Sequence, residues 1–267
     1  MQLSTDAVVI REKKLAEHDR LLTLLTRDKG VITAYARGAG KLRGSLLAST
    51  EFLCYSHFQL FQNRDRTSVD RAESEAVFFG VRQDLEKLSL ATYFCQLCCE
   101  LVPELDCDEG YLRLLLNSLF QLERDKMPSR LLKPLFELRC LSMSGYMPDL
   151  VACCHCGNPP EGGVLFSPQL GVICCPGCRT QDIPDPIPLS PGVFQAMRHI
   201  IYSDFDRLFR FRLSDQGTAE LGRVCESYLL AQVERMLPAL HFYQTVCPPQ
   251  KEQTPAKFEK EAPHGTG

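Results

Sequence analysis

The sequence predicts an α+β protein: an N-terminal β-barrel, then an α-helical domain that contains a cysteine-rich hairpin. Three observations lead to this fold class. Short β-rich segments fill residues 1–80, helical periodicity of apolar residues starts at Arg82, and two Cys-x2-Cys pairs interrupt the helical part. We expect the helical domain at residues 81–247 and the hairpin at 150–182. Residues 248–267 are rich in Pro, Lys, Glu and Gly, which is typical of a disordered tail.

Five segments near the N-terminus have the alternation and the residue types of β-strands. They are residues 7–11, 21–26, 31–36, 52–61 and 67–75. The turn Asp28-Lys29-Gly30 should join the second and third strands as a hairpin. Five short antiparallel strands are typical of a small closed barrel of the OB type, which is the N-terminal fold that we expect.

The segments after the barrel have apolar residues at helical spacing. We expect helices at residues 85–101, 111–122, 131–143, 193–202 and 218–237, with a proline-rich connector at 183–188. Ser190 is a suitable cap before Pro191 at a first helical position. Cys95, Cys98 and Cys99 lie in the first helix without a second cysteine pair nearby, so we interpret them as core residues.

The cysteine-rich hairpin carries two Cys-x2-Cys pairs that are separated by eighteen residues. Their members are Cys153, Cys156, Cys175 and Cys178. Residues 164–166 and 171–173 are predicted as short strands around a turn, and this hairpin would carry the second pair back to the first. Four thiolates complete a tetrahedron and leave no open position, so we expect a zinc ribbon with one structural zinc ion.

Other assignments of these cysteines stay open from sequence alone. Cys154 and Cys174 flank the proposed ligands and could replace one of them, and His155 could serve in place of a cysteine. Free thiols or a disulfide are the alternatives without metal. The two equal spacings, and the glycines at 157 and 177 that suit tight turns, favour the metal site.

The formal net charge of −3 excludes a protein that is basic all over, but the charge is unevenly placed. Between Arg11 and Arg43 there are nine Lys or Arg against four Asp or Glu. A local basic surface on a nearly neutral protein is typical of phosphate-backbone binding, and an ordinary solvated face is the alternative. No segment has the length of a membrane helix and the N-terminus lacks a signal peptide pattern, so we expect a cytoplasmic, nucleoid-associated protein.

Three motif pairs, in their order along the chain, resemble one known family. The first is residues 6–10 (DAVVI) followed by 17–21 (EHDRL), and the second is 26–30 (TRDKG) followed by 36–39 (ARGA). The third is residues 145–150 (GYMPDL) followed by the first Cys-x2-Cys pair. With the barrel, the helical domain and the four cysteines, the chain resembles the bacterial recombination mediator family RecO over residues 1–245.

The resemblance implies a protein that is not an enzyme. RecO-like proteins bind single- and double-stranded DNA and anneal complementary strands. With RecR they replace single-strand binding protein by RecA on DNA. The sequence departs from the family pattern at Gly40, where the basic loop often carries another cation. Some RecO-like proteins lack the cysteines, which implies a stabilising role for the metal.

OB-type barrels bind single strands in a groove where cations contact phosphates and aromatic rings stack on bases. The glycine-rich segment 37–44, which we expect to be mobile, carries three of the candidate cations, and Tyr35 precedes it as a stacking or core residue. The candidate DNA-binding residues are Arg11, Lys14, Tyr35, Arg37, Lys41, Arg43, Arg64 and Arg66.

The resemblance also implies that the helical domain receives the acidic, apolar-ended tail of single-strand binding protein. Such a tail needs an apolar groove with a few cations at its rim. Arg130, Lys133 and Arg139 lie on a predicted helix that also carries four leucines, and they are the candidate partner-binding residues. Core leucines with solvated charges are the alternative.

The residues themselves give no sign of catalysis. Residues 38–42 (GAGKL) lack the earlier glycine and the following Ser or Thr of a phosphate-binding loop. Five histidines are scattered, and none is expected beside a nucleophile; they are His18, His57, His155, His199 and His241. The alternatives are a zinc-dependent nucleic-acid-modifying enzyme that uses the barrel for docking, which would need an open metal position, and a protein-interaction scaffold without DNA binding.

Overall fold

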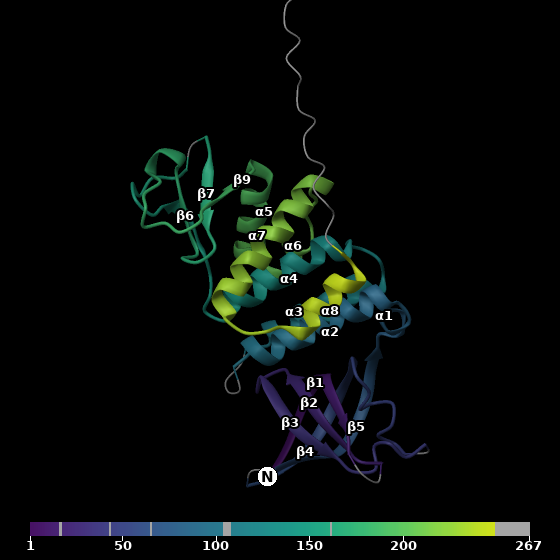
Figure 1. The fold of residues 1–267 in the computed structure, drawn as a ribbon. Coiled ribbons are helices and arrows are strands. Elements are labelled where there is room, and N and C mark those ends of the chain that lie inside the picture. Colours follow the sequence, from purple (N-terminus) through teal and green to yellow (C-terminus); the bar gives the residue numbers. More distant parts are fainter. Residues whose placement is uncertain (16–17, 43, 65, 104–107, 161, 249–267) are drawn as a thin grey trace, which may run out of the picture.

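The computed structural model describes residues 1–15, 18–42, 44–64, 66–103, 108–160 and 162–248. A β-barrel forms one end of the molecule, layers of helices form the middle, and a small sheet lies beside the helices farthest from the barrel (Figure 1). Arg43, a candidate DNA-binding residue, and residues 249–267 of the expected tail lie outside the described residues. Among the helices of the described part, none has the length and apolar character needed to cross a membrane.

The predicted five-stranded barrel is confirmed. Its strands are β1 (Gln2–Lys14), β2 (Arg20–Thr26), β3 (Val31–Ala36), β4 (Cys54–Asn63) and β5 (Arg66–Val77). They close in the order β1-β2-β3-β5-β4, with neighbours antiparallel except for a short parallel contact between β3 and β5 at Tyr35 and Ser68. The interior is filled by ten buried apolar residues, among them Val9, Leu24 and Phe58.

Two strand boundaries differ from the prediction. β1 is much longer than residues 7–11, because its first half pairs with β4 and its second half with β2. The bulge between Val9 and Arg11 lets one strand serve both neighbours. The fourth strand begins at Cys54 instead of residue 52, because Leu53 has a φ of 63°, in the left-handed region that ends extended backbone.

The helical domain contains more helices than predicted. They are α1 (Phe79–Gln83), α2 (Leu85–Leu101), α3 (Gly110–Glu123), α4 (Ser129–Met143), α5 (Pro191–Tyr202), α6 (Phe205–Leu208), α7 (Asp215–Val233) and α8 (Pro238–Val246). The expected helix 218–237 is wrong at its C-terminus. Glu234 takes a left-handed conformation with φ 48° and ends α7, and Pro238 then occupies the first turn of α8.

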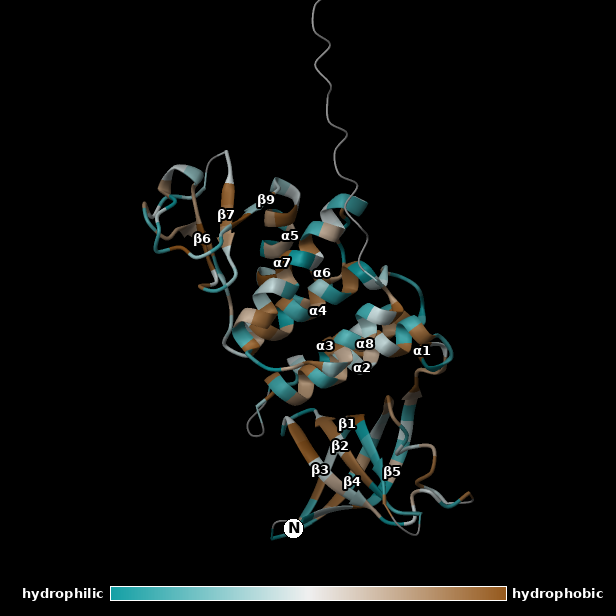
Figure 2. Ribbon diagram, viewed as in Figure 1, coloured by the Kyte–Doolittle hydropathy of each residue, from teal (hydrophilic) through white to brown (hydrophobic). Residues whose placement is uncertain are grey.

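The barrel and the helices share one apolar core. Val8 and Ile10 of β1, with Leu25 of β2, are buried in the same cluster as Phe94 of α2 and Phe136 of α4. The rings of Phe94 and Phe136 stack with centroids 4.0 Å apart. Figure 2 shows hydrophobic and hydrophilic residues alternating along the helices, as expected for amphipathic helices around a common core.

The small sheet comprises β6 (Asp149–Cys153), β7 (Val164–Ser167), β8 (Val172–Cys174) and β9 (Ile187–Leu189), in the order β6-β8-β7-β9. The hairpin predicted around residues 167–170 is confirmed as β7 and β8. β6 was not predicted, and the end of the proline-rich connector forms β9 because Ile187 and Leu189 pair with β7. The sheet is attached to α7 through Gln232, whose Nε2 donates to the carbonyl oxygens of Pro168 and Gln169.

Candidate metal centre and nucleic-acid interface

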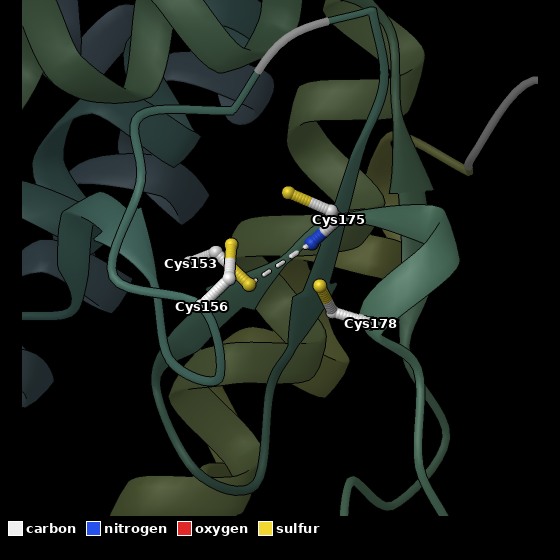
Figure 3. A group of neighbouring side chains, drawn as sticks. All are labelled: Cys153, Cys156, Cys175 and Cys178. Carbon is white, nitrogen blue, oxygen red and sulfur yellow. Dashed lines mark hydrogen bonds between the residues drawn. The ribbon is translucent and has the colours of Figure 1, made fainter.

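The four cysteines selected by their spacing come together at one end of the small sheet. Cys153 ends β6, Cys156 lies in the turn that follows, and the second pair lies just after β8 (Figure 3). Their four sulfur atoms all lie within 4.8 Å of one another. A tetrahedral zinc ion with Zn–S bonds of about 2.3 Å holds its sulfurs about 3.8 Å apart, so this arrangement fits a four-thiolate metal site. The cluster can therefore bind a metal ion.

The three alternative ligands lie outside this cluster. Within the described residues, the group of possible ligand atoms comprises only the four cysteines of the two pairs. His155 instead forms a hydrogen bond of 3.0 Å between its Nε2 and the Thr180 hydroxyl. The backbone N–H of Cys154 donates to the carbonyl of Ile173, and this bond joins the first Cys-x2-Cys pair to β8. Cys174 is buried within the sheet.

The backbone around the cluster favours a thiolate at Cys153. The backbone N–H of Cys156, followed by those of Cys175 and His155, lowers the pKa of Cys153 to about 6. One of these contacts, from the Cys175 N–H to the Cys153 sulfur at 3.4 Å, is visible in Figure 3. Hydrogen bonds with Cys156 and Cys153 raise the pKa of the Cys178 thiol to about 12. The four thiol groups, packed this closely, cannot all keep their protons at low cost. A divalent cation that replaces those protons satisfies all four sulfurs.

The remaining cysteines behave as predicted for core residues. Cys95 and Cys98 are buried in α2, and Cys99 is half-buried. Burial raises the pKa of the Cys95 thiol and of the Cys225 thiol well above the ordinary value, which makes them poor nucleophiles and poor ligands.

Several candidate DNA-binding residues share one outer face of the barrel. Strand register places Lys13, Leu21, Tyr35 and Ser68 side by side across β1, β2, β3 and β5. Tyr35 is 38% exposed, and the guanidinium of Arg66 lies 5.7 Å from the centre of its ring. Tyr35 is therefore a surface residue and not part of the barrel core. Sequence reasoning missed Lys13, whose place on this face follows from a bulge that the sequence does not reveal.

The basic segment after β3 is held by hydrogen bonds in its described part. The N–H of Gly38 donates to Asp19 Oδ1 at 2.7 Å, and the N–H of Gly40 donates to the carbonyl of His18 at 2.7 Å. These contacts hold the exposed side chains of Arg37 and Lys41 next to the end of β3. A Cβ at position 40 would meet the His18 carbonyl oxygen at 3.1 Å, so a larger residue there would require His18 to shift by a few tenths of an ångström.

The other candidates lie at different places on the barrel. Arg11 is exposed and lines a groove of about 520 Å³ between the barrel and the helices, together with Cys99 of α2 and Pro238 of α8. Lys14 is exposed at the end of β1, opposite Arg20 of β2. Arg64 lies in the β4–β5 turn with a φ of 50° and is exposed. The structure thus groups Tyr35, Arg66, Arg37 and Lys41, and it sets Arg11 apart.

The three candidate partner-binding residues do not form one rim. Lys133 is buried, with its Nζ 2.7 Å from Glu137 and 2.7 Å from Glu226. Arg139 donates to the carbonyl oxygens of Ile200 and Ile201 at the end of α5. α4 is a central helix whose leucines are buried, so its cations mostly serve internal partners. Only Arg130 is exposed, and it lines a cavity of about 390 Å³.

One histidine departs from the expectation that none lies beside a nucleophile. His57 Nε2 is 2.8 Å from the Ser4 hydroxyl oxygen, and His57 Nδ1 is 2.7 Å from Asp6 Oδ1. Asp6 and His57 are directly opposite on β1 and β4, two strands far apart in the sequence, so only the barrel register reveals this contact. On this partly exposed strand surface, the hydrogen bonds join the two strands that close the barrel.

Comparison with known proteins gives consistent matches along the chain. The family models described as Recombination protein O N terminal and Recombination protein O C terminal match residues 1–78 and 82–241. A DNA repair protein RecO of Symbiobacterium thermophilum is 36% identical over 91% of this chain and 97% of the relative. Proteins of the same name from Acetivibrio thermocellus and Desulforudis audaxviator are 32% and 34% identical, over 91% and 90% of this chain and 97% and 96% of theirs.

Proposed function

The chain belongs to the RecO family of recombination mediators, which are not enzymes, and we propose that it binds single- and double-stranded DNA and anneals complementary strands. Together with RecR, it would help to replace single-strand binding protein by RecA during DNA repair in the cytoplasm. The observation that carries this proposal is the outer face of the barrel, where Tyr35 and Arg66 lie beside the anchored segment of Arg37 and Lys41.

The chemistry of this face suits a single strand. The Tyr35 ring is exposed and can stack on a base, and Arg66 beside the ring can contact a phosphate or add to the stack. Lys13 is exposed in the same cross-strand row. The N–H groups of Gly38 and Gly40 are bonded to Asp19 and His18, so the contacts of this segment with a DNA backbone would come from the side chains of Arg37 and Lys41.

The metal of the four-cysteine cluster is, we infer, one structural zinc ion. Four sulfur ligands without a carboxylate favour zinc over magnesium or calcium, and a closed tetrahedral set leaves no position for a reacting water. When bound, zinc would cross-link the first Cys-x2-Cys pair to the second. Cys153, Cys156, Cys175 and Cys178 would hold it. This ligand set argues against the alternative of a zinc-dependent enzyme.

For the acidic tail of single-strand binding protein, we propose the cavity beside Arg130. Leu122 and Met127 contribute apolar atoms to its lining, which also includes Glu86 and Asp125, the latter paired with Lys87. Phe120, which is 43% exposed, and Lys126, whose Nζ is 4.6 Å from the Phe120 ring, lie on the adjacent surface. Lys133 and Arg139 are left out of this site because their side chains are engaged inside the helical domain.

The proposed DNA site is tested by removing two cations from the segment after β3. We expect the Arg37→Ala, Lys41→Ala variant to fold and to keep its metal, because both side chains are exposed. Its single-strand affinity should fall, and the slope of log affinity against log salt should drop by about 1.4, or about 0.7 for each lost phosphate contact. A Tyr35→Leu variant should lose stacking, with an effect of about 1–3 kcal/mol that depends little on salt.

The matched control removes the same charge elsewhere. Lys29 lies in the β2–β3 turn at the opposite end of that hairpin, and Arg235 follows α7. Fluorescence titrations over a salt series should show that the Lys29→Ala, Arg235→Ala variant keeps the parental slope. Equal slopes in the parent and the Arg37→Ala, Lys41→Ala variant would refute the site.

A further inference from the structure

A second group of cations lies on the helical domain, in the segment that joins α6 to α7. Residues 209–214 have no regular secondary structure beyond the turn at Phe209, and exposed and half-buried residues alternate along them. Arg210 and Arg212 are exposed, whereas Phe209, Phe211 and Leu213 pack against the main core. The segment therefore turns its apolar side chains toward the core, and its exposed side chains are those of Arg210, Arg212 and Ser214.

The arginines of this segment are presented on a firmly held backbone. The ring of Phe211 lies 5.2 Å from that of His199 on α5, and the N–H of Arg210 donates to the carbonyl of Arg207 at 2.8 Å. Ser214 ends the segment as the cap of α7, where its hydroxyl accepts from the N–H of Gly217. In an extended chain, residues two apart are separated by about 7 Å, so the side chains of Arg210 and Arg212 can reach neighbouring phosphates of one strand.

These arginines form no direct ion pair, although Asp204, Asp206 and Asp215 lie in the same stretch of chain. In the part of the chain that the structure describes, no carboxylate lies within ion-pair distance of Arg207, Arg210 or Arg212. The closest acidic residue in sequence to Arg207, Asp206, is already bound to Arg113 of α3 at 2.7 Å. The guanidinium groups of Arg113 and Arg139 lie 4.9 Å and 5.1 Å from the centre of the Phe205 ring, but Arg113 is paired with Asp206 and Arg139 donates to backbone carbonyls.

The surface fits a phosphate backbone better than an acidic peptide with an apolar end. Among the described residues, no large hydrophobic side chain is exposed between Ser203 and Leu229, and the exposed one that precedes this stretch is Tyr202 at the end of α5. No cavity with an apolar lining that a tail of this kind needs is described beside the arginines. A nucleic-acid backbone needs no apolar pocket, because its affinity comes from phosphate contacts and counterion release.

This surface is also separate from the barrel face. α5, α6 and α7 lie on the side of the helical domain away from the barrel, with α2 and α3 between them and the strands (Figure 1). Annealing needs two strands at once, and linking two binding sites on one protein raises the effective concentration of the second strand. We propose that Arg207, Arg210 and Arg212 form a second phosphate-binding track, which holds one DNA strand or duplex arm while the barrel holds the other.

This inference rests on the proposed function of the barrel, and the two can be tested apart. The test variant is Arg210→Ala, Arg212→Ala in the full chain, and the conservative variant is Arg210→Lys, Arg212→Lys. Both arginines are exposed, so zinc content and thermal unfolding should match the parent. Affinity for an oligonucleotide too short to span both sites should be unchanged in both variants, because the barrel is intact.

The double alanine variant should anneal complementary strands at least about tenfold more slowly, a small part of the 10²–10⁴ that linked sites gain. Its salt slope for duplex binding should fall by about 1.8, or about 0.9 for each lost contact. The lysine variant should restore most of the annealing rate, since charge at this place is sufficient for phosphate contact.

Unchanged annealing and an unchanged duplex slope in the alanine variant would overturn the second track and leave the barrel site intact. Loss of binding to an acidic peptide probe with normal annealing would also overturn it, in favour of a protein partner. If the parent itself fails to bind the short oligonucleotide, the proposed function fails instead, which the Arg37→Ala, Lys41→Ala comparison detects independently.

Discussion

The closed barrel and the small four-cysteine sheet differ in how much apolar surface each encloses. Ten buried apolar residues fill the barrel, and its strands pair around a closed circle. At its cysteine end, the described part of the small sheet encloses a separate cluster of three buried residues, Cys153, Cys174 and Ile183, whereas its other buried residues, such as Phe166 and Ile173, belong to the core that it shares with the helices. The cysteine end has too little apolar core of its own to offset the conformational entropy of ordering its turns without a cross-link. The metal site takes the place that a hydrophobic core has in the barrel.

The largest expected effect comes from breaking the metal site. Cys156→Ser with Cys175→Ser should abolish stoichiometric zinc and unfold the small sheet locally, at a cost of several kcal/mol, because structural zinc binding is coupled to folding. Hydrogen exchange read by mass spectrometry should show loss of protection in β6, β7 and β8. Protection in β1 to β5 and single-strand binding should stay at parental levels. A stable sheet with bound zinc in this variant would contradict the ligand assignment.

The matched experiment in the barrel is Leu60→Ala. This residue is fully buried in the barrel interior, so its truncation should cost about 2–5 kcal/mol of unfolding free energy. Zinc content should remain parental until the whole chain unfolds. If Leu60→Ala releases zinc at low denaturant, the two sheets do not unfold separately.

The next largest effect concerns the buried ion pairs of the helical domain. Lys133→Met should cost about 3–5 kcal/mol, because it leaves the Glu137 carboxylate buried without its cation. The control Glu137→Gln keeps the shape and a hydrogen-bond acceptor for Tyr93, whose hydroxyl donates to Glu137 at 2.6 Å. Lys133 keeps its second partner, Glu226, in this control. Urea unfolding should therefore show that Lys133→Met is clearly less stable than Glu137→Gln. The reverse order would show that Glu137 does not need Lys133 for the stability of the fold.

The same pair gives a pH dependence with a definite sign. Burial raises the pKa of Glu137 above its ordinary value of 4.5, more than Lys133 lowers it. The folded state thus favours the protonated carboxyl, and this stabilisation is lost as pH rises through the raised pKa. The stability of the parent relative to Glu137→Gln should decline as pH rises above 4.5. A difference that grows with pH would mean that Lys133 lowers this pKa instead.

The smallest expected effect tests how the small sheet is attached to the helices. Gln232→Ala removes two hydrogen bonds to the turn before β8 and should cost about 1 kcal/mol. Zinc should stay bound, and exchange should quicken at Pro168–Gly171 more than near the cysteines. Faster exchange around the cysteines instead would show that metal binding depends on the attachment of the sheet to α7.

Local signals in the sequence predicted most of the barrel and the four cysteines that come together in the small sheet. Cys-x2-Cys spacing restricts which sulfurs can meet, and alternating residues restrict which faces of strands are buried, so both features could be inferred before the fold. From sequence, Tyr35 could be either a stacking residue or a core residue. The strand register and its exposure place it on the surface. The bulge that turns Lys13 to the same face is a tertiary feature without a sequence signal.

Several predictions that failed concern contacts between residues that are distant in sequence. Lys133 was expected at the rim of a partner groove, but Glu226 lies 93 residues away on α7 and pairs with it. Ser4 and His57 were not connected for the same reason. The break between α7 and α8 rests on one left-handed residue, Glu234, which the helical periodicity of its neighbours conceals.

The shared core limits how the protein can be divided. The two family models meet at residues 78–82, which suggests a convenient place to cut the chain. A fragment ending there would carry Val8, Ile10, Leu25 and Leu53 without the helices that cover them. Such exposed apolar surface promotes aggregation. A barrel made for DNA-binding studies therefore needs polar replacements at these positions, and a helical fragment needs a substitute for the surface that β1 covers.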